Sequence, residues 1–193
     1  EDQPSIEFKS MHPNFDALTR HQSINAHFRS WEKGLTGYPF IDACMRSLTQ
    51  IGWINFRMRA MLVSFASYDL WLDWKITGNL LAKLFTDYEP GIHYSQLQMQ
   101  SGVTGINTFR IYNPVKQSIE HDENGIFIKK WVPELKNLDC SFIHEPWKMD
   151  LTTQKNNNCI LGKDYPNRIV IHEEVIKFAR NEIKKILKTD NYY

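Results

Sequence analysis

The chain has 193 residues, of which 42% are hydrophobic and 13% aromatic, and a formal net charge of +1. This length allows one sizeable core, so we expect a single domain over residues 1–193, and the composition excludes a mainly disordered chain. The near-neutral charge gives no global attraction for nucleic acid. Binding of that kind would therefore require a local basic patch.

Cysteine usage and hydropathy narrow the class of protein further. Cys44, Cys140 and Cys159 are odd in number and widely spaced, which predicts neither a disulfide framework nor a metal site. No segment reaches the roughly eighteen apolar residues of a membrane span, and the acidic start Glu1-Asp2-Gln3 is not typical of a signal peptide. We therefore expect a soluble, cytoplasmic protein without bound metal or membrane contact.

The first part of the chain moves from an irregular segment into helices. Residues 1–22 contain two prolines and little periodicity, which predicts an extended arm or a short helix. Asn25 is a typical cap for a helix that ends at Gly34. Apolar residues at i, i+3 and i+4 spacing then predict a second helix from Phe40, which Gly52 ends.

Helical signals continue through most of the remaining sequence. A long ordered loop is expected after residue 100, and residues 136–168 predict a second stretch of long loops. The fold class that we predict is all-α, a multi-helical domain. Its further helices are expected from Asn55 to about Leu72, Lys75 to Thr86, Pro90 to Gln100, Ile126 to Trp131 and His172 to Lys188.

Charged residues around the apolar helix from Asn55 predict a polar pocket in an apolar setting. An arginine such as Arg59 needs a partner if it enters a core. Asp87, Glu89 and His93 surround the helix-starting Pro90, where the turn would bring them back towards the preceding helix. Arg59 with Asp87 could be a structural salt bridge, or it could present a charged edge to a planar polar ligand.

Six linked motifs are more specific than any of these single residues. In order and spacing they resemble the flavin-binding helical domain of the photolyase/cryptochrome family, from about Trp31 to Trp147 and more weakly towards the C-terminus. The resemblance implies the C-terminal part of the all-α FAD-binding domain. The motifs are Trp31-Glu32-Lys33-Gly34-Leu35-Thr36-Gly37-Tyr38-Pro39, Asp42-Ala43-Cys44-Met45-Arg46, Gly52-Trp53, Asp73-Trp74, Phe109-Arg110-Ile111-Tyr112-Asn113-Pro114 and Trp131-Val132-Pro133-Glu134-Leu135.

The resemblance implies FAD as cofactor and assigns residues to it. Arg59 and Asp87 match positions that lie against the isoalloxazine ring, and Glu89 matches a second acidic residue at the same ring. Trp53 and Arg46 would border the site. The family's phosphate-binding loop has no counterpart here, because no Gly-rich strand–helix loop is present.

Two residues are catalytic candidates by resemblance. His93 matches the position facing the ring nitrogen that takes up a proton, where an asparagine or aspartate is common, and its near-neutral ordinary pKa makes it a candidate proton donor. Trp74 matches the middle member of the tryptophan chain that passes an electron to the excited flavin. Leu97 and His21 replace the tryptophans at the two ends of that chain. Other aromatic candidates for an electron route are Trp53, Trp71, Tyr88 and Tyr94.

The resemblance also implies contact with DNA. Phe56 occupies the position where photolyases that repair cyclobutane dimers place an asparagine against the lesion, and Met99 occupies the position of a stacking tryptophan. The alternative for both residues is a place in the core. The candidates for contact with DNA phosphates are Arg110, Lys116, Lys129 and Lys130.

Three classes of function remain open from the sequence. The first is light-driven electron transfer from reduced flavin to UV-damaged DNA, a deoxyribodipyrimidine photo-lyase-like activity that would repair pyrimidine dimers. It would need the missing first half of the domain, supplied by a complementary chain or by sequence outside this one. The second is a flavin blue-light sensor of the cryptochrome kind that acts through a protein partner, and the third is a cofactor-free helical scaffold.

Overall fold

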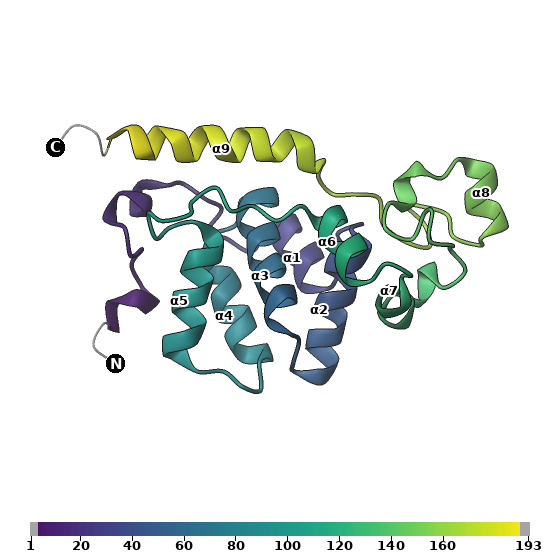
Figure 1. The fold of residues 1–193 in the computed structure, drawn as a ribbon, viewed down its shortest axis with the longest axis horizontal. Coiled ribbons are helices and arrows are strands. Elements are labelled where there is room, and N and C mark those ends of the chain that lie inside the picture. The colour runs from purple at the N-terminus through teal and green to yellow at the C-terminus, as the bar shows by residue number, and fades with distance from the viewer. Residues whose placement is uncertain (1–3, 190–193) are drawn as a thin grey trace.

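The computed structural model describes residues 4–189, and its regular elements within that range are all helical. Figure 1 shows α2, α3, α4 and α5 side by side, with α9 lying across the upper ends of these helices in the view. The predicted all-α fold is confirmed. The α-helices are α1 (Ala26–Glu32), α2 (Pro39–Ile51), α3 (Phe56–Ser64), α4 (Trp74–Leu84), α5 (Pro90–Ser101), α6 (Pro114–His121), α7 (Ile126–Trp131), α8 (Leu151–Asn156) and α9 (His172–Thr189).

Helix boundaries follow the capping signals of the sequence. The side chain of Asn25 accepts a hydrogen bond of 2.9 Å from the backbone N–H of Phe28, which begins α1 as predicted. Gly52 ends α2 with a left-handed φ of 78°, a conformation that glycine adopts at little cost. In the same way, Asn55 caps α3 through the N–H of Met58.

The long apolar helix is interrupted, so its predicted continuous run to Leu72 is wrong. After Ser64 the chain continues as η3 (Phe65–Asp69), a π-helical turn in which Leu70 N–H donates to the carbonyl of Phe65 at 3.1 Å. Trp71 then has a φ of 52° and ends the helical path. Apolar periodicity continues through this turn because its side chains are buried, and therefore periodicity alone does not mark the break.

Two helices lie inside segments that the sequence predicts as loops. The helix α6 begins at Pro114, and Asn113 caps it by accepting from the N–H groups of Val115 and Lys116 at 3.0 Å each. Asn-Pro is also a common loop signal, which explains why the helix is missed. The short helix α8 within residues 136–168 is capped by Asp150.

The segment before the bundle is held against it by a buried polar side chain. Gln98 of α5 donates to the carbonyls of Ile6 and Lys9 and accepts from Met11 N–H, so the described part of the predicted arm packs along α5. The first three residues, Glu1 to Gln3, lie outside the described residues. The remaining short elements are the 3-10 turns η1 (Pro4–Glu7), η2 (Pro13–Ala17), η4 (Pro133–Leu135) and η5 (Pro146–Lys148).

A buried carboxylate on α2 holds the segment around residue 165 in the same way. Asp42 accepts from the N–H and hydroxyl of Thr36 at 2.8 and 2.6 Å and from the hydroxyl of Tyr165 at 2.5 Å. Burial raises the pKa of Asp42, while the donors oppose that rise. The side chain is therefore a fixed acceptor in the core.

Two kinds of feature are absent from residues 4–189, the described part of the chain. Across that range, no helix has the length and apolar character needed to cross a bilayer. The same residues bring together no group of three or more His, Cys, Asp or Glu side chains that could hold a metal ion.

Candidate functional site

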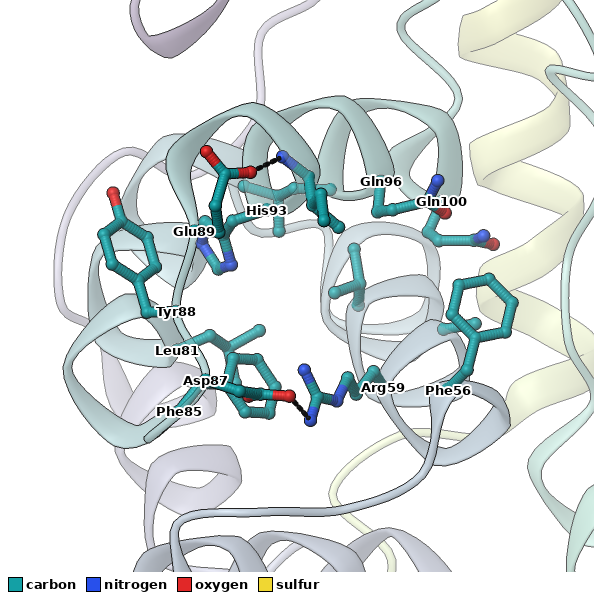
Figure 2. A pocket seen from close by; sticks show the side chains of 14 residues that line it. Phe56, Arg59, Leu81, Phe85, Asp87, Tyr88, Glu89, His93, Gln96 and Gln100 are labelled. Atoms are coloured by element: carbon teal, nitrogen blue, oxygen red, sulfur yellow. Dashed lines mark hydrogen bonds and ion pairs between the residues drawn. The ribbon is translucent and has the colours of Figure 1, made fainter.

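An apolar cavity with polar side chains at its edge lies between α3 and the end of α4 on one side and α5 on the other. Its volume is about 580 Å³ when the space open to solvent is included. Figure 2 shows the side chains around it. The lining residues are Phe56, Arg59, Ala60, Val63, Leu81, Phe85, Asp87, Tyr88, Glu89, Ile92, His93, Gln96, Leu97 and Gln100.

Arg59 projects from α3 to the edge of the cavity and is fixed on several sides. Its Nη2 donates to Asp87 Oδ2 at 2.9 Å, and its Nε donates to the carbonyl of Ile54 at 2.8 Å. The guanidinium carbon lies 4.1 Å from the ring centroid of Phe85 and 5.9 Å from that of Trp53. The pair that the sequence predicts therefore forms, and it holds a planar cation at the cavity edge.

Water reaches the Arg59–Asp87 pair. The side chains are 25% and 48% exposed, respectively. The hydrogen bond from Arg59 lowers the pKa of Asp87, so the carboxylate stays ionised at neutral pH. An ion pair this open contributes little to folding stability. Its charges are therefore available to a ligand that enters the cavity.

Glu89 lines the cavity but is already engaged as a helix cap. Its two carboxylate oxygens accept from Gly91 N–H at 3.1 Å and from Ile92 N–H at 2.7 Å, both in the first turn of α5. These backbone donors, that of Ile92 first, lower the pKa of Glu89. The sequence interpretation of Glu89 as a ring contact thus competes with an evident capping role.

His93 is a neutral hydrogen-bonding group in this structure. Its Nε2 lies 3.0 Å from the carbonyl oxygen of Gly78 on α4, and a carbonyl only accepts, so Nε2 carries the proton. Burial lowers the pKa of His93 below its ordinary value, and the charge of Arg59 adds to this, while the bond to Gly78 opposes it. The neutral ring therefore keeps Nδ1 as an acceptor, and donation of a proton from Nδ1 would require a second proton on the ring.

The rest of the lining fits a flat ring with a polar edge. Ala60, Val63 and Leu81 give apolar surface, and the buried Oε1 of Gln96 has no hydrogen-bond partner among the described residues. An unpartnered buried acceptor is costly unless a ligand or water donates to it. Arg59 is the only Lys or Arg among the fourteen lining residues, so the cavity suits the isoalloxazine ring better than the phosphates of FAD.

Sequence reasoning missed several of these lining residues. Gln96 and Gln100 border the cavity without having been predicted, and Tyr88, which the sequence suggested only as a candidate for an electron route, borders it too. The positions 89, 93, 96 and 100 recur at three- and four-residue intervals and so fall on one face of α5. That spacing was a usable signal, but neutral polar side chains do not reveal from sequence which face of a helix they occupy.

Four other predicted residues lie at or beyond the boundary of the site. Phe56 lines the cavity and is 54% exposed, so it is not a core residue. Trp53 is largely exposed and contacts Arg59 from outside the lining. Trp74 is buried and lies 6.5 Å from Tyr94, ring centroid to ring centroid. Trp74 and Met99 are both absent from the lining.

Arg46 belongs to a different part of the molecule. Its Nη1 donates to Glu134 Oε2 at 2.8 Å, and its Nε donates to the carbonyl of Gly34 at 3.0 Å. The side chain joins α2 to η4 and does not line the cavity. In this structure Arg46 thus acts as a structural link, and its interpretation as a residue bordering the cofactor site stays a prediction.

The candidate DNA contacts are spread over other surfaces. Arg110 borders a separate open hollow next to Leu187 of α9, and Lys116 pairs with Glu120 at 3.7 Å on α6. Lys129 and Lys130 lie on α7, which packs against α2, whereas the cavity lies between α3 and α5. The structure therefore does not gather these four cations at the cavity mouth.

Comparison with known proteins places this geometry in a family. A sequence profile described as the FAD binding domain of DNA photolyase matches residues 1–185. The chain belongs to the DNA photolyase family. The photolyase/cryptochrome resemblance is thereby confirmed, and FAD is the cofactor of the family domain that the chain represents.

Relatives in this family include photolyases and cryptochromes. The chain is 39% identical over 157 residues to a deoxyribodipyrimidine photo-lyase of Alkalihalophilus pseudofirmus, an alignment that covers 80% of this chain and 33% of that protein. It is 33% identical to cryptochrome DASH of Synechocystis, over 86% of this chain and 34% of that one. The chain thus spans about a third of the length of these photolyase-family relatives.

A solved photolyase structure has the same fold as this chain. A bacterial class III photolyase from Agrobacterium tumefaciens superposes with a TM-score of 0.90 at 30% sequence identity, covering 96% of this chain and 39% of that one. Nearly the whole described photolyase-family domain therefore has a counterpart in a larger solved protein.

Proposed function

We propose that the cavity receives the isoalloxazine ring of FAD and that this chain forms one side of the flavin site of a light-driven DNA lyase. The observation that carries the proposal is that Arg59, Asp87, His93 and Gln96 all line one apolar cavity. In a chain of the DNA photolyase family, that donor and acceptor set matches a heteroaromatic ring with a polar edge. Glu89 and Trp53 would meet the ring from the rim.

Each of these residues has a role that its surroundings support. The Arg59 guanidinium, held flat against Phe85, would place positive charge at the polar edge of the ring. Val63 and Leu81 would give the ring an apolar surface to lie against. His93 would accept a hydrogen bond through Nδ1, or exchange a proton there once its ring carries a second one. FAD, when bound and reduced, would donate an electron to the pyrimidine dimer under light and recover it after bond scission.

The substrate that we propose is UV-damaged DNA with pyrimidine dimers, because the relatives include a deoxyribodipyrimidine photo-lyase. Phe56 at the cavity edge would stack against a flipped-out base rather than hydrogen-bond to it, since its ring is apolar and half exposed. Arg110 and Lys130 would contact phosphates farther away. We further propose that a complementary chain, or sequence outside this one, binds the FAD phosphates, and that the protein works in the cytoplasm.

A blue-light sensor that acts through a protein partner is the second candidate function. The observation that favours it is the exposed apolar rim of the cavity, formed by Trp53, Phe56, Tyr88 and Ile92. The lining holds one Lys or Arg, Arg59. A rim of this kind suits an apolar protein surface better than a phosphate backbone.

Titration with FAD tests the cavity assignment. We expect Arg59→Met to weaken FAD binding by about tenfold, since it removes a charge-assisted contact worth about 1.5 kcal/mol. The measurement is the change in the visible flavin absorption of FAD on addition of protein. Arg57→Met is the matched control, because Arg57 is exposed on the same helix and does not line the cavity. Equal FAD affinity in the two variants would remove the assignment.

Irradiated DNA separates the two candidate functions. The lyase predicts that the chain, supplied with reduced FAD and any complementary segment, restores ultraviolet-damaged oligonucleotides under blue light and not in the dark. The sensor predicts light-dependent changes in the protein without loss of dimers. A chain that takes up no FAD under either condition would support the cofactor-free scaffold instead.

A further inference from the structure

The side chains that line the cavity carry more negative than positive charge. Arg59 is the one Lys or Arg among the fourteen lining residues, and its Nη2 already donates to Asp87 Oδ2 at 2.9 Å. Glu89 is a second carboxylate in the same lining, and Figure 2 shows it and Asp87 on different sides of the enclosed space. The hydrogen bond from Arg59 lowers the pKa of Asp87, and backbone N–H donors lower that of Glu89. Both carboxylates are therefore ionised at neutral pH.

The start of α5 would otherwise be the natural place at this cavity for a phosphate, because the N–H groups of a helix N-terminus bind anions. Here the carboxylate of Glu89 accepts from Gly91 N–H at 3.1 Å and from Ile92 N–H at 2.7 Å. The N–H of His93 donates to the carbonyl of Glu89 at 2.8 Å, and Pro90 has no N–H. The donors of this first turn are thus taken, and a phosphate there would meet a carboxylate.

The rim next to Glu89 is apolar. Tyr88 and Ile92, one residue before and three residues after it, are 39% and 66% exposed and also line the cavity. The cavity volume of about 580 Å³, open space included, suits one small ligand. Its surroundings therefore favour a flat ring whose substituents are uncharged.

We propose that the cavity takes phosphate-free flavins, such as riboflavin, and that this chain binds riboflavin at least as tightly as FAD. The inference rests on the proposed function, because the same isoalloxazine ring would meet Arg59 in both ligands. The ribityl chain ends in a hydroxyl group in riboflavin and continues into a diphosphate in FAD. The lining offers that diphosphate two carboxylates and one cation that is already paired. The additional part of FAD therefore gains no affinity from this chain.

FMN makes the charge argument sharper, because it is riboflavin with one added phosphate. That phosphate carries about two negative charges at neutral pH. At low ionic strength and a separation of about 10 Å, repulsion by a net negative lining should weaken binding by about two- to fivefold. The difference should vanish at about 0.5 M salt, where screening acts within a few Å.

Titration of the purified chain with riboflavin, FMN and FAD tests the proposal. The change in visible flavin absorption on binding gives each Kd, at low salt and at about 0.5 M salt. We expect the Kd of riboflavin to be equal to or below that of FAD at both salt concentrations. The Kd of FMN should exceed that of riboflavin by about two- to fivefold at low salt only. These comparisons use the wild-type chain and require no variant to fold.

Two variants connect the result to the cavity. Arg59→Met should weaken riboflavin and FAD binding by the same factor, about tenfold, since the ring contact is common to both. Arg57→Met is its control and should leave both affinities unchanged. Glu89→Gln removes one negative charge from the lining and should abolish the low-salt disadvantage of FMN. Glu174→Gln, at an exposed position on α9, should retain that disadvantage.

An FAD affinity more than about threefold above that of riboflavin would overturn the inference and leave the proposed FAD site in place. An FMN affinity that exceeds that of riboflavin and falls as salt is added would also overturn it, because cations would then hold the phosphate. Loss of FAD binding alone in Arg59→Met would overturn it as well, since riboflavin would then lie elsewhere. A chain that binds neither riboflavin nor FAD would overturn both this inference and the cavity assignment.

Discussion

Two carboxylates form contacts at opposite ends of the helical segment made of α3 and η3, and they differ in their exposure to water. Asp87 pairs with Arg59 at the cavity, where the side chains are 48% and 25% exposed, whereas Asp69 meets His172 with 0% and 11% exposed. The pKa of Asp87 is lowered by its partner, and that of Asp69 is raised by burial. Access of water thus decides whether a carboxylate offers its charge to a ligand or holds the fold together.

The largest effect on folding is expected from breaking the buried contact. His172→Ala removes the one partner of Asp69 Oδ1 and should lower the free energy of unfolding by about 3 kcal/mol at neutral pH, since a buried carboxylate is left unpaired. Denaturant unfolding followed by circular dichroism measures this change. His121→Ala, at an exposed position, is the control. Equal stability of both variants would show that the contact does not matter for folding.

A smaller loss is expected at a second buried carboxylate, that of Asp42. Tyr165→Phe removes the hydroxyl that donates to Asp42 Oδ2, so the free energy of unfolding should fall by about 1 to 2 kcal/mol. Tyr112→Phe, at a partly exposed tyrosine, should be nearly neutral. A comparison of the two denaturation midpoints tests this. No difference between them would mean that Thr36 and Gly37 satisfy the carboxylate without Tyr165.

The exposed Arg59–Asp87 pair should contribute little to folding stability and more to FAD affinity. Asp87→Asn is expected to change the free energy of unfolding by less than about 1 kcal/mol, because water already screens the pair. FAD affinity should nevertheless fall several-fold, since Arg59 loses the acceptor that orients it. Denaturation and FAD titration on the same variant separate the effects. A large loss of stability in Asp87→Asn would show that Asp87 stabilises the fold as the buried Asp69 does, and would contradict the comparison.

The smallest effect concerns the titration of His93. Its pKa in the folded chain is lowered, so the unfolded chain binds more protons and stability should decrease as the pH falls below 6.5. His93→Gln should lack that part of the decrease. The histidine resonances in an NMR titration give the pKa directly. A His93 pKa at or above 6.5 would show that the ring is not held neutral by burial.

Much of the fold could be predicted because local rules and tertiary packing agree. Asn25 and Gly52 mark helix ends by capping, and these ends are found where the sequence places them. Asn113 with Pro114 is ambiguous, since the same dipeptide caps a helix and punctuates a loop. The π-helical turn at Phe65–Asp69 was beyond prediction, because its buried side chains keep the apolar pattern of an α-helix.

The candidate site could be predicted only in part. The Arg59–Asp87 pair could be predicted because an arginine in an apolar helix needs a partner, and the structure contains this pair. Arg46 is close in sequence to a family motif, yet its hydrogen bond to Glu134 takes it to another surface. Gln96 was missed because a neutral amide shows its importance only when the structure leaves its oxygen without a partner.

The π-helical turn η3 also sets the angle around the helix axis between the side chains of α3 and those at the end of η3. A π turn contains one residue more than an α turn, and each residue of a helix rotates the chain by about 100°. Deleting Ser67 would turn the segment back into α-helix, keep Arg59 at the cavity and swing the position of Asp69 away from His172. The extra residue in η3 therefore sets which way each end of the helix faces.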